Sequence, residues 1–481
     1  MDSDIVIAAE EAIKSLKENL HPSSRVTELW KNFIRDVRRH YEEGSYSSSS
    51  EVSSEENQRM IGKKLVVLLS KEIGRGTDGT VVYEGRYEGR EVAVKRLQQS
   101  HIKLVDQEIA NLIASDHGHN IVRYHGVESD TNFLYLALER CACNLMDLIE
   151  MHSTNSSQNE ENILGNAKLW KANIDRPSSL LLKLMRDMVS GLVVLHNSCI
   201  VHRDLKPQNV LIIKQSSTLC AKLSDMGISR KLSDNRFSLS NHPSSCAAST
   251  GWKAPEQLQL VGRQTKKMDL FSLGCILFYC ITGGKHPFGH SDERDGNIRK
   301  KQPDLSSIED FPEAFDLISS LLQFDLEKRP EASEVMHHPL FWNAKTRLYF
   351  FRDTSDSVSE NPNLLSGLQS TAKTVLGTDS KGNVTPWNTK IFNNEINLNH
   401  PKIKGTYKFD KVEDLLRFIR NRLSHYRQDS EDIKKHFGSL YEGFNDFFTC
   451  QFPKLFFEVY KVVRKYCKED EFFKAYFEED Q

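Results

Sequence analysis

One stretch, residues 201–210, carries three side chains whose types and spacing suit phosphoryl transfer. Transfer of a phosphoryl group to a hydroxyl needs an acceptor for the hydroxyl proton, a cation beside the transferred phosphate, and an oxygen ligand for magnesium. Asp204, Lys206 and Asn209 supply these groups within a single loop. The stretch, which reads VHRDLKPQNV, therefore predicts a catalytic loop.

This loop matches the protein-kinase pattern H-R-D-L-x-x-x-N at every fixed position. Residues 73–81 fit the glycine-rich loop G-x-G-x-x-G-x-V, whose glycines let backbone N–H groups approach phosphates. By itself this motif is also compatible with a Rossmann turn. A Rossmann motif opens a helix, whereas here two alternating strands follow, 80–87 and 90–95, joined by a turn at 88–89. The order of the motifs favours a kinase.

The nucleotide-binding residues are predicted from the same order of motifs. Lys95 is expected to contact the α- and β-phosphates, and Glu108, on a predicted helix, to pair with Lys95. The alternative for Glu108 is a solvated surface glutamate. Strand 133–138 leads to a predicted hinge whose backbone holds adenine. The residues assigned to ATP or ADP are Ile73, Gly74, Gly76, Gly79, Val81, Lys95, Glu108, Glu139 and Cys141.

Magnesium and regulation are predicted from the following segment. Asp225-Met226-Gly227 occupies the position of the kinase D-F-G, so Asp225 and Asn209 are the predicted Mg²⁺ ligands. Met226 replaces the usual phenylalanine and can fill the same apolar slot. From there to Ala254-Pro255-Glu256 the chain is rich in serine, which predicts a phosphorylation-controlled segment or a merely flexible loop. Arg329 is expected to bind Glu256, and Lys206 is typical of serine/threonine kinases.

The length and composition of the chain limit the possible classes of protein. The chain has 481 residues, about three domains' worth, and 38% hydrophobic residues, which indicates a soluble globular protein. Nine scattered cysteines without C-x-x-C predict reduced thiols in the cytosol and no zinc site. No window holds 18 apolar residues, and the acidic N-terminus lacks a signal-peptide pattern, so no membrane span is expected.

The predicted domain boundaries are 1–63 for an N-terminal helical or disordered segment, 64–342 for the kinase and 343–475 for a second domain. Residues 26–37 have helical spacing and predict either a packed helix or a partner-binding one. Residues 45–51 form a polar linker, and 152–178 a mostly polar insert in the kinase.

A second candidate site lies in the last domain. Residues 402–427 hold eight Lys/Arg against three acids on a chain of net charge −2, with two tyrosines interleaved, which suits RNA. A predicted helix over 412–426 places Asn421 and His425 on one face. His425 and Tyr407 could exchange protons with the 2′-OH and 5′-oxygen of RNA, while Arg420 and Asn421 hold the phosphate without a metal. The alternative is an exposed helix with a lone histidine.

The chain resembles the cytosolic half of the inositol-requiring enzyme 1 family, unfolded-protein sensors that join a kinase directly to an endoribonuclease. The specific marks are residues 338–342, 350–356, 406–408 and 414–426. The resemblance implies an α+β architecture, a bilobal protein-kinase fold followed by an all-α KEN-type ribonuclease domain. It maps the nuclease residues onto Tyr407, Arg420, Asn421 and His425, and shows Arg422 in place of the usual lysine.

The resemblance also implies trans-autophosphorylation and a back-to-back kinase dimer or higher oligomer that cuts stem-loops in mRNA, for unconventional splicing and RNA decay in the unfolded protein response. The 2-5A-dependent ribonuclease shares the two-domain plan but carries ankyrin repeats, and no such repeat of about 33 residues occurs here. The family's lumenal domain and membrane span have no counterpart in this sequence. The expected location is the cytoplasm or the cytosolic face of the endoplasmic reticulum.

Three hypotheses follow. The first is a bifunctional serine/threonine kinase and metal-independent endoribonuclease that uses ATP or ADP and Mg²⁺. The second is a non-sensing regulatory or decoy subunit that forms heterodimers with full-length family members. The third is a plain kinase whose C-terminal domain only binds partners.

Overall fold

The computed structural model describes residues 52–53, 58–76, 79–98, 102–153, 168–171, 176–215, 218–226, 230–231, 251–259, 265–392 and 406–477. The chain divides into two compact units. Unit 1 comprises 1–170, 180–304 and 320–333, and unit 2 comprises 171–179, 305–319 and 334–481. The predicted N-terminal helix, the polar linker and most of the serine-rich segment lie outside the described residues.

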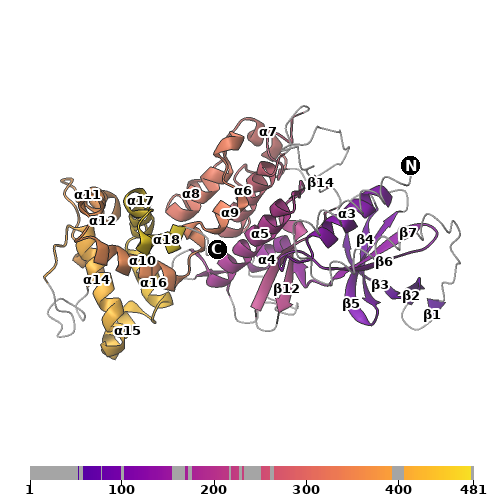
Figure 1. Cartoon of the computed structure of the whole chain (residues 1–481), viewed down its shortest axis with the longest axis horizontal. Helices are drawn as coiled ribbons and strands as arrows, with labels where there is room; N and C mark the ends of the chain where they lie inside the picture. Colours follow the sequence, from indigo (N-terminus) through magenta and orange to yellow (C-terminus); the bar gives the residue numbers. More distant parts are fainter. Residues whose placement is uncertain are drawn as a thin grey trace. The chain divides into compact units, whose positions relative to one another are not determined.

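Unit 1 contains an antiparallel sheet (Figure 1). Its described strands, in spatial order, are β1 (Val52–Ser53), β2 (Gln58–Ile61), β3 (Leu65–Arg75), β4 (Val81–Tyr87), β5 (Arg90–Gln98), β7 (Phe133–Glu139) and β6 (Tyr124–Ser129). Helix α3 (Ile102–Ala114) lies beside the sheet. Because β1 and β2 precede residue 64, the sheet begins earlier in the chain than the predicted nucleotide lobe.

The predicted hairpin of β4 and β5 is confirmed, with Tyr87 opposite Arg90. Glu88 and Gly89 both have positive φ, 49° and 81°, the conformation that a two-residue hairpin turn requires. Val92 and Val94 are fully buried in the sheet core. Since side chains alternate along a strand, this burial directs Lys95 to the opposite face of the sheet.

The rest of unit 1 is mainly helical and carries the catalytic loop. Its α5 (Ser179–Asn197) and α6 (Lys267–Ile281) are long, and α6 is buried from Met268 to Ile281. Among the described residues, no helix combines the length and apolar character that crossing a bilayer demands.

The other elements of this part are short. A small sheet contains β13 (Thr218–Leu223), β12 (Val210–Gln215) and β8 (Cys143–Asn144). β11 (Ile200–Val201) pairs with β14 (Arg230–Lys231), and β9 (Trp170–Lys171) pairs with β10 (Arg176–Pro177), of which all but Trp170 belongs to unit 2. The helices are α4 (Leu145–Ser153), α7 (Arg294–Arg299), α8 (Pro312–Leu321) and α9 (Ala332–Met336), of which α8 and α9 contribute residues to both units.

The C-terminal part of unit 2 is helical, as predicted, apart from one isolated β-bridge between Thr378 and Val384 among the described residues. Asn343 and Asn361 begin the first two helices, each accepting a backbone N–H as an N-cap. The helices are α10 (Ala344–Ser357), α11 (Pro362–Ser370), α12 (Ala372–Leu376), α13 (Asn388–Ile391), α14 (Val412–His425), α15 (Glu431–Phe437), α16 (Glu442–Gln451), α17 (Leu455–Cys467) and α18 (Glu471–Phe477).

An aromatic core positions the predicted nuclease residues in this unit. Trp387 is fully buried, and its ring centroid lies 5.4 Å from that of Phe418 on α14. The ring of Tyr407 packs against both, at 5.8 Å from Trp387 and 5.7 Å from Phe418. Edge-to-face contacts of this kind fix ring orientation as well as bury area. The core therefore holds the loop bearing Tyr407 against α14.

Candidate functional site

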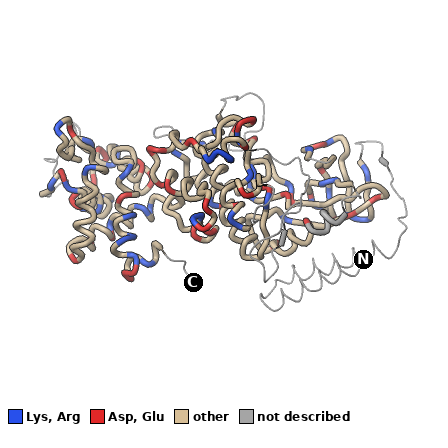
Figure 2. Tube along the Cα trace, turned by 90° about the horizontal axis from the view of Figure 1, so that it is seen from above, with Lys and Arg blue, Asp and Glu red and all other residues tan. Residues whose placement is uncertain are grey.

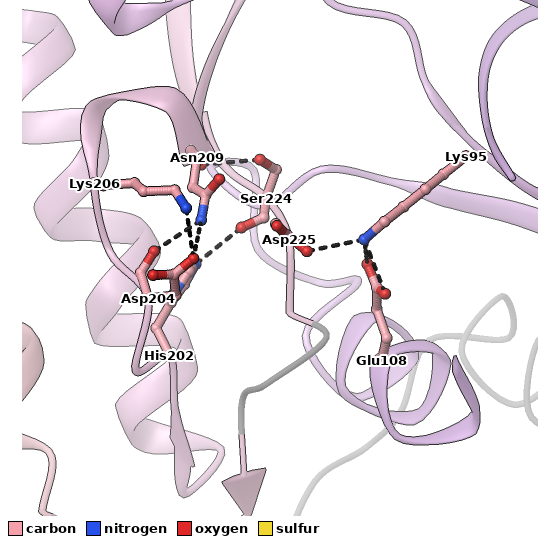
Figure 3. A network of polar contacts seen from close by, with 8 residues as sticks. All are labelled: Lys95, Glu108, His202, Asp204, Lys206, Asn209, Ser224 and Asp225. Atoms are coloured by element: carbon pink, nitrogen blue, oxygen red, sulfur yellow. Dashed lines mark hydrogen bonds and ion pairs between the residues drawn. The ribbon is translucent and has the colours of Figure 1, made fainter. Parts of the chain in front are cut away.

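The predicted phosphate-binding lysine lies between two carboxylates (Figure 3). Lys95 Nζ is 2.8 Å from Glu108 Oε1 and 2.8 Å from Asp225 Oδ1. Burial by itself would lower the pKa of Lys95, but the charges of Asp225 and Glu108 outweigh burial and raise it. The positive charge of Lys95 in turn lowers the pKa of Asp225 to about 2. Both groups are therefore ionised near neutral pH.

The catalytic loop forms a second polar cluster, shown on the left of Figure 3. Asp204 Oδ2 lies 2.8 Å from Lys206 Nζ and 3.1 Å from Asn209 Nδ2. Asn209 Nδ2 also donates to the Asp204 carbonyl at 2.8 Å. The structure therefore brings the three residues of the sequence motif together around one carboxylate.

A buried aspartate anchors the backbone of the catalytic loop by hydrogen bonds. Asp269 of α6 accepts the backbone N–H groups of His202 at 2.8 Å and Arg203 at 2.9 Å. Arg203 has a φ of 71°, a left-handed conformation that a non-glycine residue keeps only when its surroundings stabilise it. The His202 ring contacts the Ser224 carbonyl at 2.9 Å, next to Asp225. The sequence analysis did not predict this role of Asp269. An acidic residue within the apolar stretch of α6 was the feature that could have indicated it.

The glycine-rich loop is described in part, because residues 77–78 lie outside the described ranges. Gly79 has a φ of 74°, which favours glycine at that position. Val81 is buried in the sheet core, whereas Ile73 is 47% exposed. An exposed branched side chain at the start of this loop suits a contact with a flat apolar base.

The predicted hinge begins at Glu139, the last residue of β7, whose side chain faces Lys222 rather than solvent. Ala142 N–H donates to the Ile212 carbonyl at 2.8 Å. Within the described ranges, neither backbone group of Cys141 has a hydrogen-bond partner. These are the groups that remain available for a nucleotide base. Burial, followed by the charge of Glu139, raises the pKa of the Cys141 thiol to about 12.

The predicted contact between Arg329 and Glu256 is confirmed. The two side chains form a buried bidentate pair at 2.6 Å and 3.0 Å. This pair anchors the end of the activation segment. The predicted phosphorylation sites from Ser229 to Thr250 lie outside the described residues.

The side-chain oxygens beside the catalytic loop suit a magnesium ion. The Asn209 amide nitrogen is engaged twice with Asp204, which leaves its oxygen as the free acceptor. Together with the ionised Asp225, it offers the hard oxygen ligands that Mg²⁺ prefers. Among the described residues, no three His, Cys, Asp or Glu side chains gather into a metal cluster. The residues therefore fit Mg²⁺, which the side-chain oxygens of Asn209 and Asp225 would hold and which would neutralise phosphate charge.

The predicted nuclease residues come from α14 and the loop before it. Asn421 Nδ2 donates to the Tyr407 hydroxyl at 3.0 Å, and Arg420 Nε donates to Asn421 Oδ1 at 3.2 Å. Arg420 Nη1 also lies 2.5 Å from Asp356 of α10, a partner that sequence reasoning missed. Three of the four predicted residues therefore form one hydrogen-bonded chain.

The fourth residue, His425, stands apart from this chain. It is exposed at the end of α14, one turn beyond Asn421, and its Nδ1 lies 3.3 Å from Gln428 Oε1. The structure records no hydrogen bond between His425 and Tyr407, Arg420 or Asn421. Asn421 and His425 share a face of α14, but the four predicted residues do not form one hydrogen-bonded network.

The basic segment 402–427 is partly neutralised, and Figure 2 shows basic and acidic residues interspersed along the chain. Arg417 pairs with Asp414 at 2.6 Å. Arg422 pairs with Asp429 at 2.7 Å, and both of these side chains are buried. The arginine at 422 therefore holds the turn after α14 instead of facing the nuclease residues. Four of the eight predicted cations, Lys411, Arg417, Arg420 and Arg422, are in ion pairs in the part of the segment that the structure describes.

Comparison with known proteins matches each half of the chain to a protein family. Residues 68–341 match the family described as "Protein kinase domain", and residues 347–477 match "Ribonuclease 2-5A". An Arabidopsis thaliana protein named inactive serine/threonine-protein kinase/endoribonuclease IRE1-like is 36% identical over 444 residues, which cover 87% of this chain and 79% of that relative. The chain belongs to the IRE1 family.

Other IRE1 relatives are longer. Serine/threonine-protein kinase/endoribonuclease IRE1b of Arabidopsis thaliana is 49% identical over 444 residues, 88% of this chain and 49% of the relative. The Schizosaccharomyces pombe protein named sensor for unfolded proteins in the ER is 36% identical over 438 residues, 84% of this chain and 38% of that relative. The chain thus spans half or less of the length of these two IRE1 proteins.

Proposed function

We propose that the chain is a bifunctional enzyme, a serine/threonine kinase that phosphorylates its own family members in trans and a metal-independent endoribonuclease. The observation that carries this proposal is the presence of two separate polar constellations in one chain, around Lys95 and Asp204 in unit 1 and around Asn421 in unit 2. The family matches to a kinase and a ribonuclease domain support it.

In the kinase half, the residues of the chain position and neutralise the nucleotide. Lys95, held by Glu108, contacts the α- and β-phosphates, and Cys141 offers its backbone groups to adenine. Asn209 and Asp225 hold Mg²⁺, which neutralises phosphate charge when it is bound. Asp204 accepts the proton of the attacking hydroxyl, and Lys206 beside it stabilises the transferred phosphoryl group.

In the ribonuclease half, one proton leaves the 2′-OH of RNA and one reaches the departing 5′-oxygen. The Tyr407 hydroxyl accepts a hydrogen bond from Asn421, so its own proton is free to be donated. We assign Tyr407 as the acid and His425 as the base. Arg420 and Asn421 hold the phosphate while the 2′-oxygen attacks phosphorus and the P–O5′ bond breaks, leaving a cyclic phosphate.

The expected substrate is an RNA stem-loop within an mRNA, cut in unconventional splicing or RNA decay of the unfolded protein response. The expected active form is a homodimer or higher oligomer in the cytosol or at the cytosolic face of the endoplasmic reticulum. Supporting this is the S. pombe relative, which is named a sensor for unfolded proteins in the ER.

The test is cleavage of a short RNA stem-loop by the purified chain, with and without ADP and magnesium, beside His425→Ala. Three results together would support both the kinase and the ribonuclease assignment. Nucleotide should stimulate cleavage, EDTA should leave the cleavage without nucleotide intact, and His425→Ala should abolish cleavage. Equal cleavage by His425→Ala contradicts the nuclease assignment and leaves a plain kinase with an interaction domain as the better hypothesis.

A second candidate is a regulatory or decoy subunit that pairs with full-length family members. The relative named inactive, of which the chain covers 79%, favours keeping this alternative. Co-purification with a membrane-bound relative, together with no cleavage at concentrations that force dimers, would select it. A homodimer that cleaves RNA without any partner would reject it.

A further inference from the structure

Strand β13 carries a buried lysine to which the proposed kinase mechanism assigns no role. Lys222 is 3% exposed and stands in β13 among the buried residues Ala221 and Leu223. Its Nζ lies 2.9 Å from Glu139 Oε2, 83 residues away in the sequence. A buried ammonium is costly unless a counter-charge compensates it, so this pair constrains the two strands that carry it.

Its partner begins the hinge and is held from several sides. Glu139 lies opposite Val92 in the pairing of β7 with β5. Its backbone N–H donates to the Arg123 carbonyl at 2.9 Å, and its carboxylate accepts the Arg123 N–H at 3.2 Å. The bond to Lys222 adds a contact with β13, the strand that ends just before Asp225.

The hinge is anchored at its far end as well. Ala142 N–H bonds to Ile212, and Cys143 pairs with Ile212 in the small sheet. Cys141 lies between these anchors, and its backbone groups have no partner among the described residues. The direction in which Cys141 presents these groups therefore depends on where Glu139 and Ala142 are held.

We propose that Lys222 is a positioning residue for the nucleotide base: its ion pair with Glu139 fixes the hinge so that the Glu139 carbonyl and the backbone groups of Cys141 face adenine. The inference rests on the proposed nucleotide binding and deepens it. Adenine is read by a donor and an acceptor at fixed separation, whereas guanine reverses that pattern at the same edge. A fixed hinge therefore favours adenine over guanine nucleotides.

The experiment measures the Kd of ADP and GDP by calorimetry on the full chain. Lys222→Met leaves the Glu139 carboxylate without its counter-charge, and we expect ADP affinity to fall roughly tenfold, with little change for GDP. Lys222→Arg keeps the charge and should remain within about threefold of wild type. Glu139→Gln, a milder change that guards against a misfolded Lys222→Met, should lose discrimination in the same way.

The control is Lys267→Met, which removes another lysine ion pair of unit 1, with Glu331, that involves neither β13 nor the hinge. It should leave both Kd values unchanged. Three outcomes would each overturn the inference. They are full additivity of the effects of Lys222→Met and Glu139→Gln on the binding free energy of ADP, unchanged ADP affinity in folded Lys222→Met, and equal losses of affinity for ADP and GDP. A wild-type chain that binds no ADP would instead overturn the proposed kinase half.

Discussion

The two candidate sites are assembled in opposite ways. The kinase residues come from β5, α3, the catalytic loop and the segment after β13, and ion pairs at 2.8 Å hold them together. Three of the four ribonuclease residues come from the single helix α14, and the fourth, Tyr407, is packed against it by aromatic rings. The first site depends on long-range pairing, and the second on the register of one helix.

The two sites also differ in how many of their predicted residues are joined by hydrogen bonds or ion pairs. In unit 1 the predicted phosphate and metal residues all take part in polar contacts, in one cluster around Lys95 and another around Asp204. In unit 2 the predicted base His425 is exposed and lies outside the chain of hydrogen bonds that joins Arg420, Asn421 and Tyr407. A network fixed by folding tolerates little change, whereas an open site is completed when its ligand binds.

The largest effect should come from the residue that stands apart. His425→Ala removes the proposed base, and we expect RNA cleavage to fall about 10³-fold with unchanged thermal stability, because the side chain is exposed. Cleavage of a fluorescent stem-loop measures this. Ser424→Ala, the exposed neighbour on the same helix, is the matched control and should cleave normally. Normal cleavage by His425→Ala would remove the contrast between the two sites.

Lys95→Met should affect folding and nucleotide binding together. It leaves Glu108 buried without its cation, so we expect the free energy of unfolding to fall by about 3 kcal/mol. Nucleotide stimulation of RNA cleavage should disappear while basal cleavage remains. Urea denaturation and stem-loop assays measure the two effects, and Lys214→Met, an exposed lysine of β12, is the control. Retained stimulation by ADP would contradict the assignment of Lys95.

The pH dependence of stability should report the ion pair of Asp225. Its pKa is lowered from 3.8 to about 2 by Lys95, so its contribution to stability is complete above pH 4 and is lost as the pH falls toward 2. Urea midpoints at pH 5, 4 and 3 should fall less steeply in Lys95→Met than in wild type. Parallel midpoints in the two proteins would show that this pair does not set the dependence.

Arg422→Lys should have the smallest effect. The buried pair with Asp429 holds the turn after α14, and lysine keeps its charge but not the fork of donors. We expect a loss of about 1 kcal/mol in unfolding free energy and cleavage within about twofold of wild type. Thermal melting and the stem-loop assay measure this. A tenfold loss of cleavage would place residue 422 in the nuclease site after all.

Part of each site could be predicted because several of its residues lie close together in the sequence. Asp204, Lys206 and Asn209 occupy one loop, so their contact follows from local geometry. The β4–β5 hairpin followed from its turn, and the face shared by Asn421 and His425 followed from helical period. The site roles of these residues stay predictions until the variants are measured.

Only the tertiary structure decided which charges are used internally. Asp269 reaches the catalytic loop across 67 residues, Lys222 meets Glu139 across 83, and Arg420 meets Asp356 across 64. From sequence alone, Arg417, Arg420 and Arg422 counted equally as a basic patch, yet each has an acidic partner. Residue types and short spacings determine what chemistry is available, whereas burial and long-range pairing determine which charges remain for a ligand, because desolvation makes an unpaired buried charge too costly.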